Sequence, residues 1–187
     1  FSVKEELIST WGEGVLSNPH GASIGSDQCI YLTDNFDHTL RKFSLEGKLL
    51  LKIGTADESS DFMSEKPFCK CTHSAISPTG SIFVFDGYQN ACIHKFDPKG
   101  KLLMSWGTSW TGPKEINLPH NICCDPDGWV CVADRENSRF QIFDTNGQFE
   151  TQINNMHRPS APAITPSTCP NCIIGELASY LKVNQDF

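Results

Sequence analysis

The sequence has no long apolar run and no excess of positive charge. No apolar stretch approaches the roughly 18 residues that a transmembrane helix needs, so we do not expect a membrane span. The 187 residues carry a formal net charge of -7. An acidic surface repels phosphate backbones, which argues against nucleic acid as a partner. A glycine-rich phosphate loop, a nucleophile elbow and an HExxH motif are also missing, so the sequence carries none of these common catalytic or nucleotide-binding signatures.

The sequence also lacks helical periodicity, but it contains a repeat. His20, His73 and His120 are 53 and 47 residues apart, and each is followed at nearly constant offsets by an aspartate, a phenylalanine and a glycine. The aspartates are Asp34, Asp86 and Asp134, the phenylalanines Phe43, Phe96 and Phe143, and the glycines Gly47, Gly100 and Gly147. Such self-similarity is typical of propellers and solenoids. In those folds equivalent residues gather around one axis, so the three histidines can face one another.

Each repeat predicts four short antiparallel strands separated by turns. The strands are expected at 21–24, 29–33, 39–43 and 48–53 in the first repeat, at 74–76, 82–85, 92–96 and 101–106 in the second, and at 121–123, 129–133, 139–143 and 148–153 in the third. A four-stranded unit of about 40–50 residues is a propeller blade. The predicted fold class is therefore an all-β propeller.

The whole chain is expected to form a single propeller domain. Its blade units are expected at 19–66, 67–113 and 114–153, with a partial fourth unit at 154–187. Residues 6–12 match the last strand of the second repeat, so segment 1–12 either completes the fourth unit or shows that the chain is a piece of a larger ring, which we favour. Trp11 and Trp106 occupy matching positions and are expected to pack between blades.

The nine cysteines are an odd number and do not form the even framework of a small disulfide scaffold. Cys29, Cys123 and Cys131 fall in expected strands, where a free cysteine usually acts as a small buried hydrophobe. Mostly reduced thiols are favoured, but a secretory origin with a few disulfides stays open, so the location is either extracellular or cytoplasmic. Cys169 and Cys172 form a CxxC pair, for which we favour plain thiols. A local disulfide and part of a zinc site are the alternatives.

Four short motifs narrow the assignment. They are NPHG at 18–21, DGYQN at 86–90, LPHN at 118–121 and ADREN at 133–137. In this order, and over nearly the whole chain, they resemble peptidyl-α-hydroxyglycine α-amidating lyase and its bacterial relatives, which form six-bladed propellers of NHL repeats. The resemblance implies that about four of six blades are present, as a truncated or open ring.

The resemblance also implies a zinc ion held by three histidines of PH motifs, and His20 and His120 match two of them. The third family histidine comes from a later blade, after the last residue of this sequence. His73 departs from the family pattern and is a weaker candidate for a substitute ligand. Tyr88 matches the catalytic tyrosine of the DGY motif, and Arg135 matches a catalytic arginine of ADREN. A structural calcium (Ca2+) held largely by backbone carbonyls is implied too.

The chemistry of these residues fits the implied reaction. Zinc (Zn2+) suits imidazole ligands, and a catalytic zinc site keeps one position open beside three protein ligands. The implied substrate is a peptide or small hydroxylated amide that ends in α-hydroxyglycine. Its hydroxyl would lose a proton to Tyr88, and Arg135 would hold its carboxylate in a bidentate pair. The products would be an amidated peptide and glyoxylate.

Each candidate residue also has a structural interpretation. The histidines could hydrogen-bond across the channel, Tyr88 could pack in a turn, and Arg135 could pair with Asp134 or Glu136. The aspartate of every repeat is expected to accept hydrogen bonds from turn amides. Two other functions stay open, namely a non-catalytic propeller that binds a protein or peptide on its top face, and a metal-dependent hydrolase or lactonase.

The resemblance further implies that the family disulfides are broken in this chain. Cys69 and Cys131 stand where the lyase has cysteines, but the partner positions correspond to Gln89 and Ile142. A bridge of the family type is therefore not expected at either place.

Overall fold

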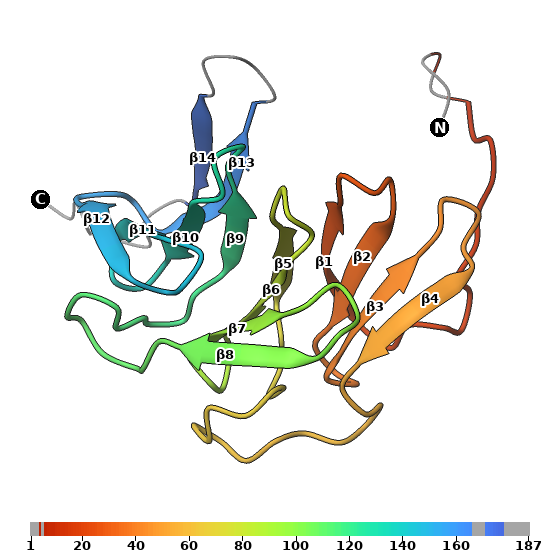
Figure 1. The fold of residues 1–187 in the computed structure, drawn as a ribbon, viewed down its shortest axis with the longest axis horizontal. Coiled ribbons are helices and arrows are strands. Elements are labelled where there is room, and N and C mark those ends of the chain that lie inside the picture. Colours follow the sequence, from red (N-terminus) through yellow and green to blue (C-terminus); the bar gives the residue numbers. More distant parts are fainter. Residues whose placement is uncertain (1–3, 5, 166–170, 178–187) are drawn as a thin grey trace, which may run out of the picture.

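The computed structural model describes residues 4, 6–165 and 171–177, and the regular elements in those ranges are all β-strands. They form three four-stranded antiparallel sheets and one two-stranded sheet, each made of consecutive strands (Figure 1). This arrangement confirms four strands per repeat and the predicted all-β propeller class. Within these ranges no helix is long and apolar enough to cross a membrane.

The strand bounds follow the repeat closely. The first sheet comprises β1 (Pro19–Ile24), β2 (Ile30–Asp34), β3 (Thr39–Phe43) and β4 (Leu49–Ile53). The second comprises β5 (His73–Ile76), β6 (Ile82–Asp86), β7 (Cys92–Phe96) and β8 (Leu102–Trp106). The third comprises β9 (Asn121–Cys124), β10 (Val130–Asp134), β11 (Arg139–Phe143) and β12 (Phe149–Ile153). The fourth pairs β13 (Pro159–Ile164) with β14 (Cys172–Glu176).

The recurring glycine belongs to the hairpin between the third and fourth strands of each sheet. In the first sheet Gly47 has a φ of 85°, and its N–H donates to the carbonyl of Ser44. Glycine adopts this left-handed backbone without the steric cost that a side chain adds. Gly100 and Gly147 make the same bond in their own sheets, and a β-bulge accompanies each turn. The recurring glycine therefore marks one hairpin in each of the three four-stranded sheets.

The apolar core lies between neighbouring sheets. In β6, Phe83 and Phe85 join a cluster with residues of the third sheet, whereas Ile82 and Val84 join a cluster with residues of the first. Because both faces of β6 are covered, its sequence is a continuous apolar run instead of an alternating one. A third, smaller cluster around Cys131 joins the third sheet to the fourth.

Two tryptophans pack onto a neighbouring sheet. The ring centroids of Trp106 at the end of β8 and Phe143 in β11 are 6.1 Å apart, and those of Trp11 and Phe43 in β3 are 5.0 Å apart. Trp11 thus occupies beside the first sheet the place that Trp106 occupies beside the third, as predicted for inter-blade packing. Residues 6–12 form no strand, so they do not extend the fourth sheet in this structure, and the unit bounds remain predictions.

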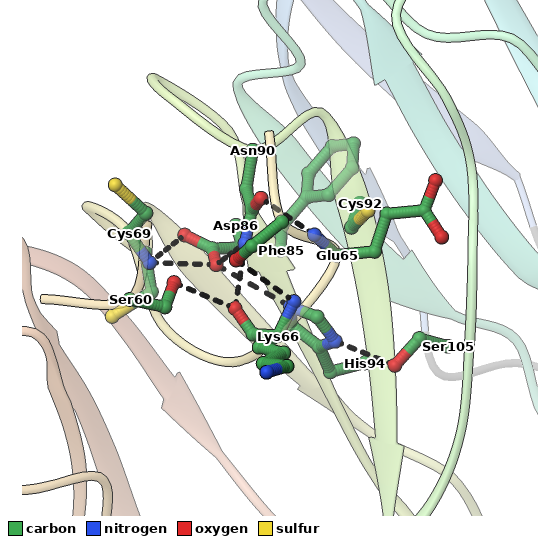
Figure 2. Close-up of polar contacts among 12 residues, drawn as sticks. Ser60, Glu65, Lys66, Cys69, Phe85, Asp86, Asn90, Cys92, His94 and Ser105 are labelled. Carbon is green, nitrogen blue, oxygen red and sulfur yellow. Dashed lines mark hydrogen bonds and ion pairs between the residues drawn. The ribbon is translucent and has the colours of Figure 1, made fainter. Parts of the chain in front are cut away.

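The recurring aspartate ties the second strand of each sheet to the loop before its inner strand. The carboxylate of the fully buried Asp86 accepts the N–H of Cys69 at 2.9 and 2.7 Å and the side-chain amide of Asn90 at 2.8 Å (Figure 2). Asp34 and Asp134 accept backbone N–H groups at the equivalent places. The predicted structural role of these aspartates is confirmed. Because the loops that they hold lead into the inner strands, the aspartates also position the histidines.

Candidate functional site

The inner strands of the four sheets lie side by side, with β1 beside β5, β5 beside β9 and β9 beside β13 (Figure 1). Each repeat places its histidine at or next to the start of its inner strand, so His20, His73 and His120 come to the same end. The ring centroids of His20 and His120 are 5.3 Å apart, at an interplanar angle of 62°. His73 lies near enough for the charges of both rings to affect it. The predicted gathering of the three histidines is confirmed.

His20 is held in a defined orientation by the neighbouring sheet. Its Nδ1 lies 2.8 Å from the carbonyl oxygen of Thr72, and because a carbonyl can only accept, Nδ1 carries the proton. In the neutral ring Nε2 is therefore the acceptor, and the hydroxyl of Tyr88 lies 3.0 Å from it. The two rings meet edge-on with centroids 5.4 Å apart. The structure thus brings the predicted ligand and the predicted catalytic tyrosine into direct contact.

His120 is oriented in the same manner by the fourth sheet. Its Nδ1 donates to the carbonyl of Ser160 at 3.0 Å. Burial lowers the pKa of His120, and the nearby Arg135 and His20 lower it further, which together outweigh the effect of the Ser160 carbonyl. Burial and the two neighbouring histidines lower the pKa of His73 to about 4. His73 and His120 are therefore neutral at neutral pH, which is the protonation state that a metal ligand requires.

Two of the histidines fit a zinc ion. A metal-binding histidine commonly donates its second ring N–H to a backbone carbonyl, which fixes the tautomer and aims the other nitrogen at the metal. His20 and His120 both have that arrangement, which would make Nε2 the ligand atom once the Tyr88 hydroxyl leaves Nε2 of His20. Among the described residues, however, no group of three or more histidine, cysteine or acidic side chains is arranged to hold a metal ion. The described chain thus supplies a pair of suitable ligands, and the assignment of His73 stays a prediction.

Arg135 belongs to a charged cluster beside His120. Its Nε donates to Oε1 of Glu136 at 2.9 Å, so the alternative pairing considered for Arg135 is present. Arg158, which precedes β13, donates to the same oxygen at 2.7 Å. Both arginines lower the pKa of Glu136, although its burial acts in the opposite direction. Glu136 thus joins the two guanidinium groups in one charged cluster beside His120. The motif pattern did not reveal Arg158, because only the fold brings the fourth sheet to this place.

Two glycines of the motifs allow the backbone segments around the site to pack closely. A Cβ on Gly87 of DGYQN would lie 2.3 Å from the carbonyl oxygen of Pro119 in LPHN. A Cβ on Gly21 of NPHG would lie 2.4 Å from Nδ1 of His73 and 2.5 Å from the carbonyl oxygen of Thr72. Neither position has room for a side chain, so the motifs interlock through backbone contacts.

The cysteine substitutions suggested by the resemblance are visible in space. The Sγ of Cys69 lies 3.2 Å from Oε1 of Gln89, and Cys131 lies directly opposite Ile142 in the paired strands β10 and β11. Each cysteine thus meets the residue that stands in its expected partner's place. Every cysteine in the described ranges is a free thiol. Cys169, half of the CxxC pair, lies outside the described residues.

A further constellation resembles a hydrolase triad in composition only. The Nε2 of His94 lies 3.3 Å from the Asp86 carboxylate and its Nδ1 lies 2.7 Å from the Ser105 hydroxyl (Figure 2). His94 and Asp86 are fully buried within the second sheet. Arg41 and Gln141 stand at the same strand position as His94 in the neighbouring sheets, and both are buried. The position therefore holds a polar link between strands, and we assign it a structural role.

Comparison with known proteins finds relatives of this chain. The NHL repeat family matches residues 117–143. The chain is 37% identical over 152 residues to peptidyl-glycine alpha-amidating monooxygenase of Mus musculus, covering 76% of this chain and 15% of that protein. It is 34% identical over 180 residues to peptidyl-alpha-hydroxyglycine alpha-amidating lyase 1 of Drosophila melanogaster, covering 88% and 33%. With NHL repeat-containing protein 3 of Homo sapiens it shares 31% over 173 residues, covering 87% and 50%.

Solved structures support the fold. A virginiamycin B lyase from Staphylococcus aureus superposes with a TM-score of 0.60 at 12% identity, covering 87% of this chain and 57% of that one. The sheets and the hairpin repeat define the class, since the described chain has the four-stranded blades of a β-propeller, and residues 117–143 match an NHL repeat. Within that class its sequence resembles the peptidyl-α-hydroxyglycine α-amidating lyases, of which it spans about a third in the fly protein.

Proposed function

We propose that the chain is the ligand-bearing part of a zinc-dependent lyase that cleaves C-terminal α-hydroxyglycine peptides to an amidated peptide and glyoxylate. One observation carries the proposal, which is the cluster of His20, Tyr88 and His120 in the motif order of the amidating lyases. The Tyr88 hydroxyl lies 3.0 Å from Nε2 of His20, and the His20 and His120 rings are 5.3 Å apart.

The residues present suit the two halves of the reaction. Zinc bound to His20 and His120, with a further ligand, would make a substrate hydroxyl more acidic. Tyr88, whose hydroxyl contacts His20, is the proposed base for the hydroxyl proton. The N–C bond then breaks, the hydroxyl oxygen becomes the aldehyde oxygen of glyoxylate, and the amide nitrogen receives the proton. Because the same proton leaves oxygen and reaches nitrogen, Tyr88 needs only to carry it.

The charged cluster provides a place for the carboxylate of the substrate. Arg135 and Arg158 share one oxygen of Glu136, and Arg135 would hold the substrate carboxylate in a bidentate pair. Arg135 lies near enough to His120 to lower its pKa. The arrangement thus favours an anionic group beside the proposed metal ligands.

A second function remains in view, namely a non-catalytic propeller that binds a peptide or protein. It is favoured by the lack of a three-ligand group among the described residues and by the relative whose name states only its NHL repeats. An assay of glyoxylate release separates the two functions. The chain, and any longer polypeptide of which it is part, is incubated with α-hydroxyhippurate and zinc, with and without a chelator.

Zinc-dependent glyoxylate that falls to background in Tyr88→Phe would support the lyase. Tyr88→Phe should keep the zinc content of the parent protein, because the phenol is not a proposed ligand. Background glyoxylate from zinc-loaded protein would exclude the lyase and leave the binding module.

A further inference from the structure

A group of cysteines lies at the seam between the third and fourth sheets. Cys123 in β9 and Cys131 in β10 are directly opposite each other in the antiparallel pair, and the Cys131 thiol is close enough to raise the pKa of Cys123. Cys131 is 5% exposed. Cys172, at the start of β14, is exposed and near enough to interact electrostatically with both. Three thiols from three strands therefore lie near one another.

The seam also contains a cavity that a small reactant can enter. A cavity of about 230 Å³ is lined by Cys131 and Cys172 together with apolar side chains of both sheets, including Ile142 and Ile164. Cys124, the chain neighbour of Cys123, packs instead against the cluster between the second and third sheets. Successive residues of a strand point to opposite faces, so Cys124 is a natural control for Cys123.

We propose that Cys123, Cys131 and Cys172 form a thiol–disulfide exchange site. Cys172 first forms a mixed disulfide with the oxidant, and Cys123 and Cys131 then close a disulfide across β9 and β10. The oxidant is a low-molecular-mass disulfide such as oxidised glutathione. This inference does not rest on the lyase function, because none of the three cysteines belongs to the histidine site.

The exchange is balanced in three steps. The thiolate of Cys172 attacks the small disulfide, forms a mixed disulfide and releases one small thiol. Cys131 loses its proton and attacks the sulfur of Cys172, which releases the second small thiol. Cys123 loses its proton and attacks the sulfur of Cys131, so Cys172 leaves and recovers a proton. Overall two protein thiols are oxidised and one small disulfide is reduced to two thiols.

The spacing of the paired strands should make the disulfide easy to reduce again. Directly opposite residues have Cβ atoms about 4.5–5.5 Å apart, whereas a disulfide draws them to about 3.5–4.5 Å. The strands must approach slightly, which makes the bond easier to reduce. Contact with Cys131, followed by burial, raises the pKa of Cys123, and burial raises that of Cys172. Exchange should therefore be slow at neutral pH and faster as the pH rises.

The test uses the 187-residue protein incubated with oxidised glutathione, alkylated and digested without reduction. A protease that cuts before aspartate separates peptide 97–124, which holds Cys123 and Cys124, from peptide 127–133, which holds Cys131. Mass spectrometry of the parent protein should find these peptides joined, with the mass of two hydrogen atoms lost, and separate again after reduction. If both peptides stay unlinked while glutathione becomes attached to Cys172, the proposal is overturned.

Cysteine variants show which thiols form the disulfide and which thiol reacts first with glutathione. Cys124→Ser should keep the cross-link and Cys123→Ser should lose it, whereas a cross-link that survives Cys123→Ser would refute the pairing. Cys172→Ser should slow cross-linking several-fold without changing its product. An unchanged rate in Cys172→Ser would contradict the entry role. Circular dichroism of each variant confirms that the sheets are retained, so a lost cross-link reflects the missing thiol.

Discussion

The buried carboxylate of Asp86 offers the sharpest test of how this fold is held. It accepts the N–H of Cys69, the side-chain amide of Asn90 and the ring N–H of His94, all without access to water (Figure 2). Asp86→Asn keeps the shape but replaces one accepting oxygen with an NH2 group. In either orientation that group faces the N–H of Cys69, so at least one buried donor is left opposite another donor.

The cost follows from burial. Each unpaired buried polar group costs about 1–3 kcal/mol, and one to two groups are affected, so Asp86→Asn should lower the free energy of unfolding by about 2–4 kcal/mol. A domain with a total stability of about 5–15 kcal/mol would remain folded. Asp97→Asn is the matched control, since Asp97 accepts the N–H groups of Lys99 and Lys101 in an exposed turn. Water can replace those bonds, and the loss should stay below about 1 kcal/mol.

Urea unfolding at pH 7, followed by tryptophan fluorescence, measures both variants against the parent protein. The dependence of the unfolding free energy on urea should be unchanged, so the midpoint alone reports stability. Equal losses in Asp86→Asn and Asp97→Asn, or a loss below about 1 kcal/mol in Asp86→Asn, would refute the reasoning that the buried aspartate anchors the blade.

Three further predictions concern the site. Gly87→Ala should cost about 1–3 kcal/mol in urea unfolding, because its Cβ would lie 2.3 Å from the Pro119 carbonyl oxygen; unchanged stability would contradict that contact. The pKa of His73 is lowered to about 4, so as the pH falls below about 6.5 the unfolded chain binds a proton first. The His73 contribution to stability, roughly 3 kcal/mol, should be lost between those pH values and be absent in His73→Gln. His20→Ala and His120→Ala should each lower the zinc content measured by metal analysis at least about tenfold, and an unchanged content would remove that residue from the ligand set.

Much of the fold could be predicted because it is local. The bounds of β3, β7 and β11 agree with those predicted from the repeat, since turn glycines and the apolar run that each hairpin contains lie within a few residues of one another. The predicted inner strands begin late, because β1 and β5 extend back to Pro19 and His73. Their first residues pair through backbone bonds to the second strand, and no side-chain pattern reports that pairing.

The contacts within the site were harder to foresee. Motif order placed His20, Tyr88 and Arg135 among the candidates, but the carbonyls that orient the histidines belong to Thr72 and Ser160 of neighbouring sheets. A backbone carbonyl is present at every residue, so its role leaves no mark in a sequence. The same applies to the thiol contacts at the seam, which depend on how two sheets pack.

The sequence by itself determined the repeat, its hairpins, the recurring buried aspartate and the order of the motifs, because each rests on residues close in the chain or on a period. Only the tertiary structure decided that His20 touches Tyr88 and lies 5.3 Å from His120, and that Arg135 shares Glu136 with Arg158. These contacts join different sheets. They depend on the packing of apolar faces across each seam, which sets where one inner strand lies relative to the next.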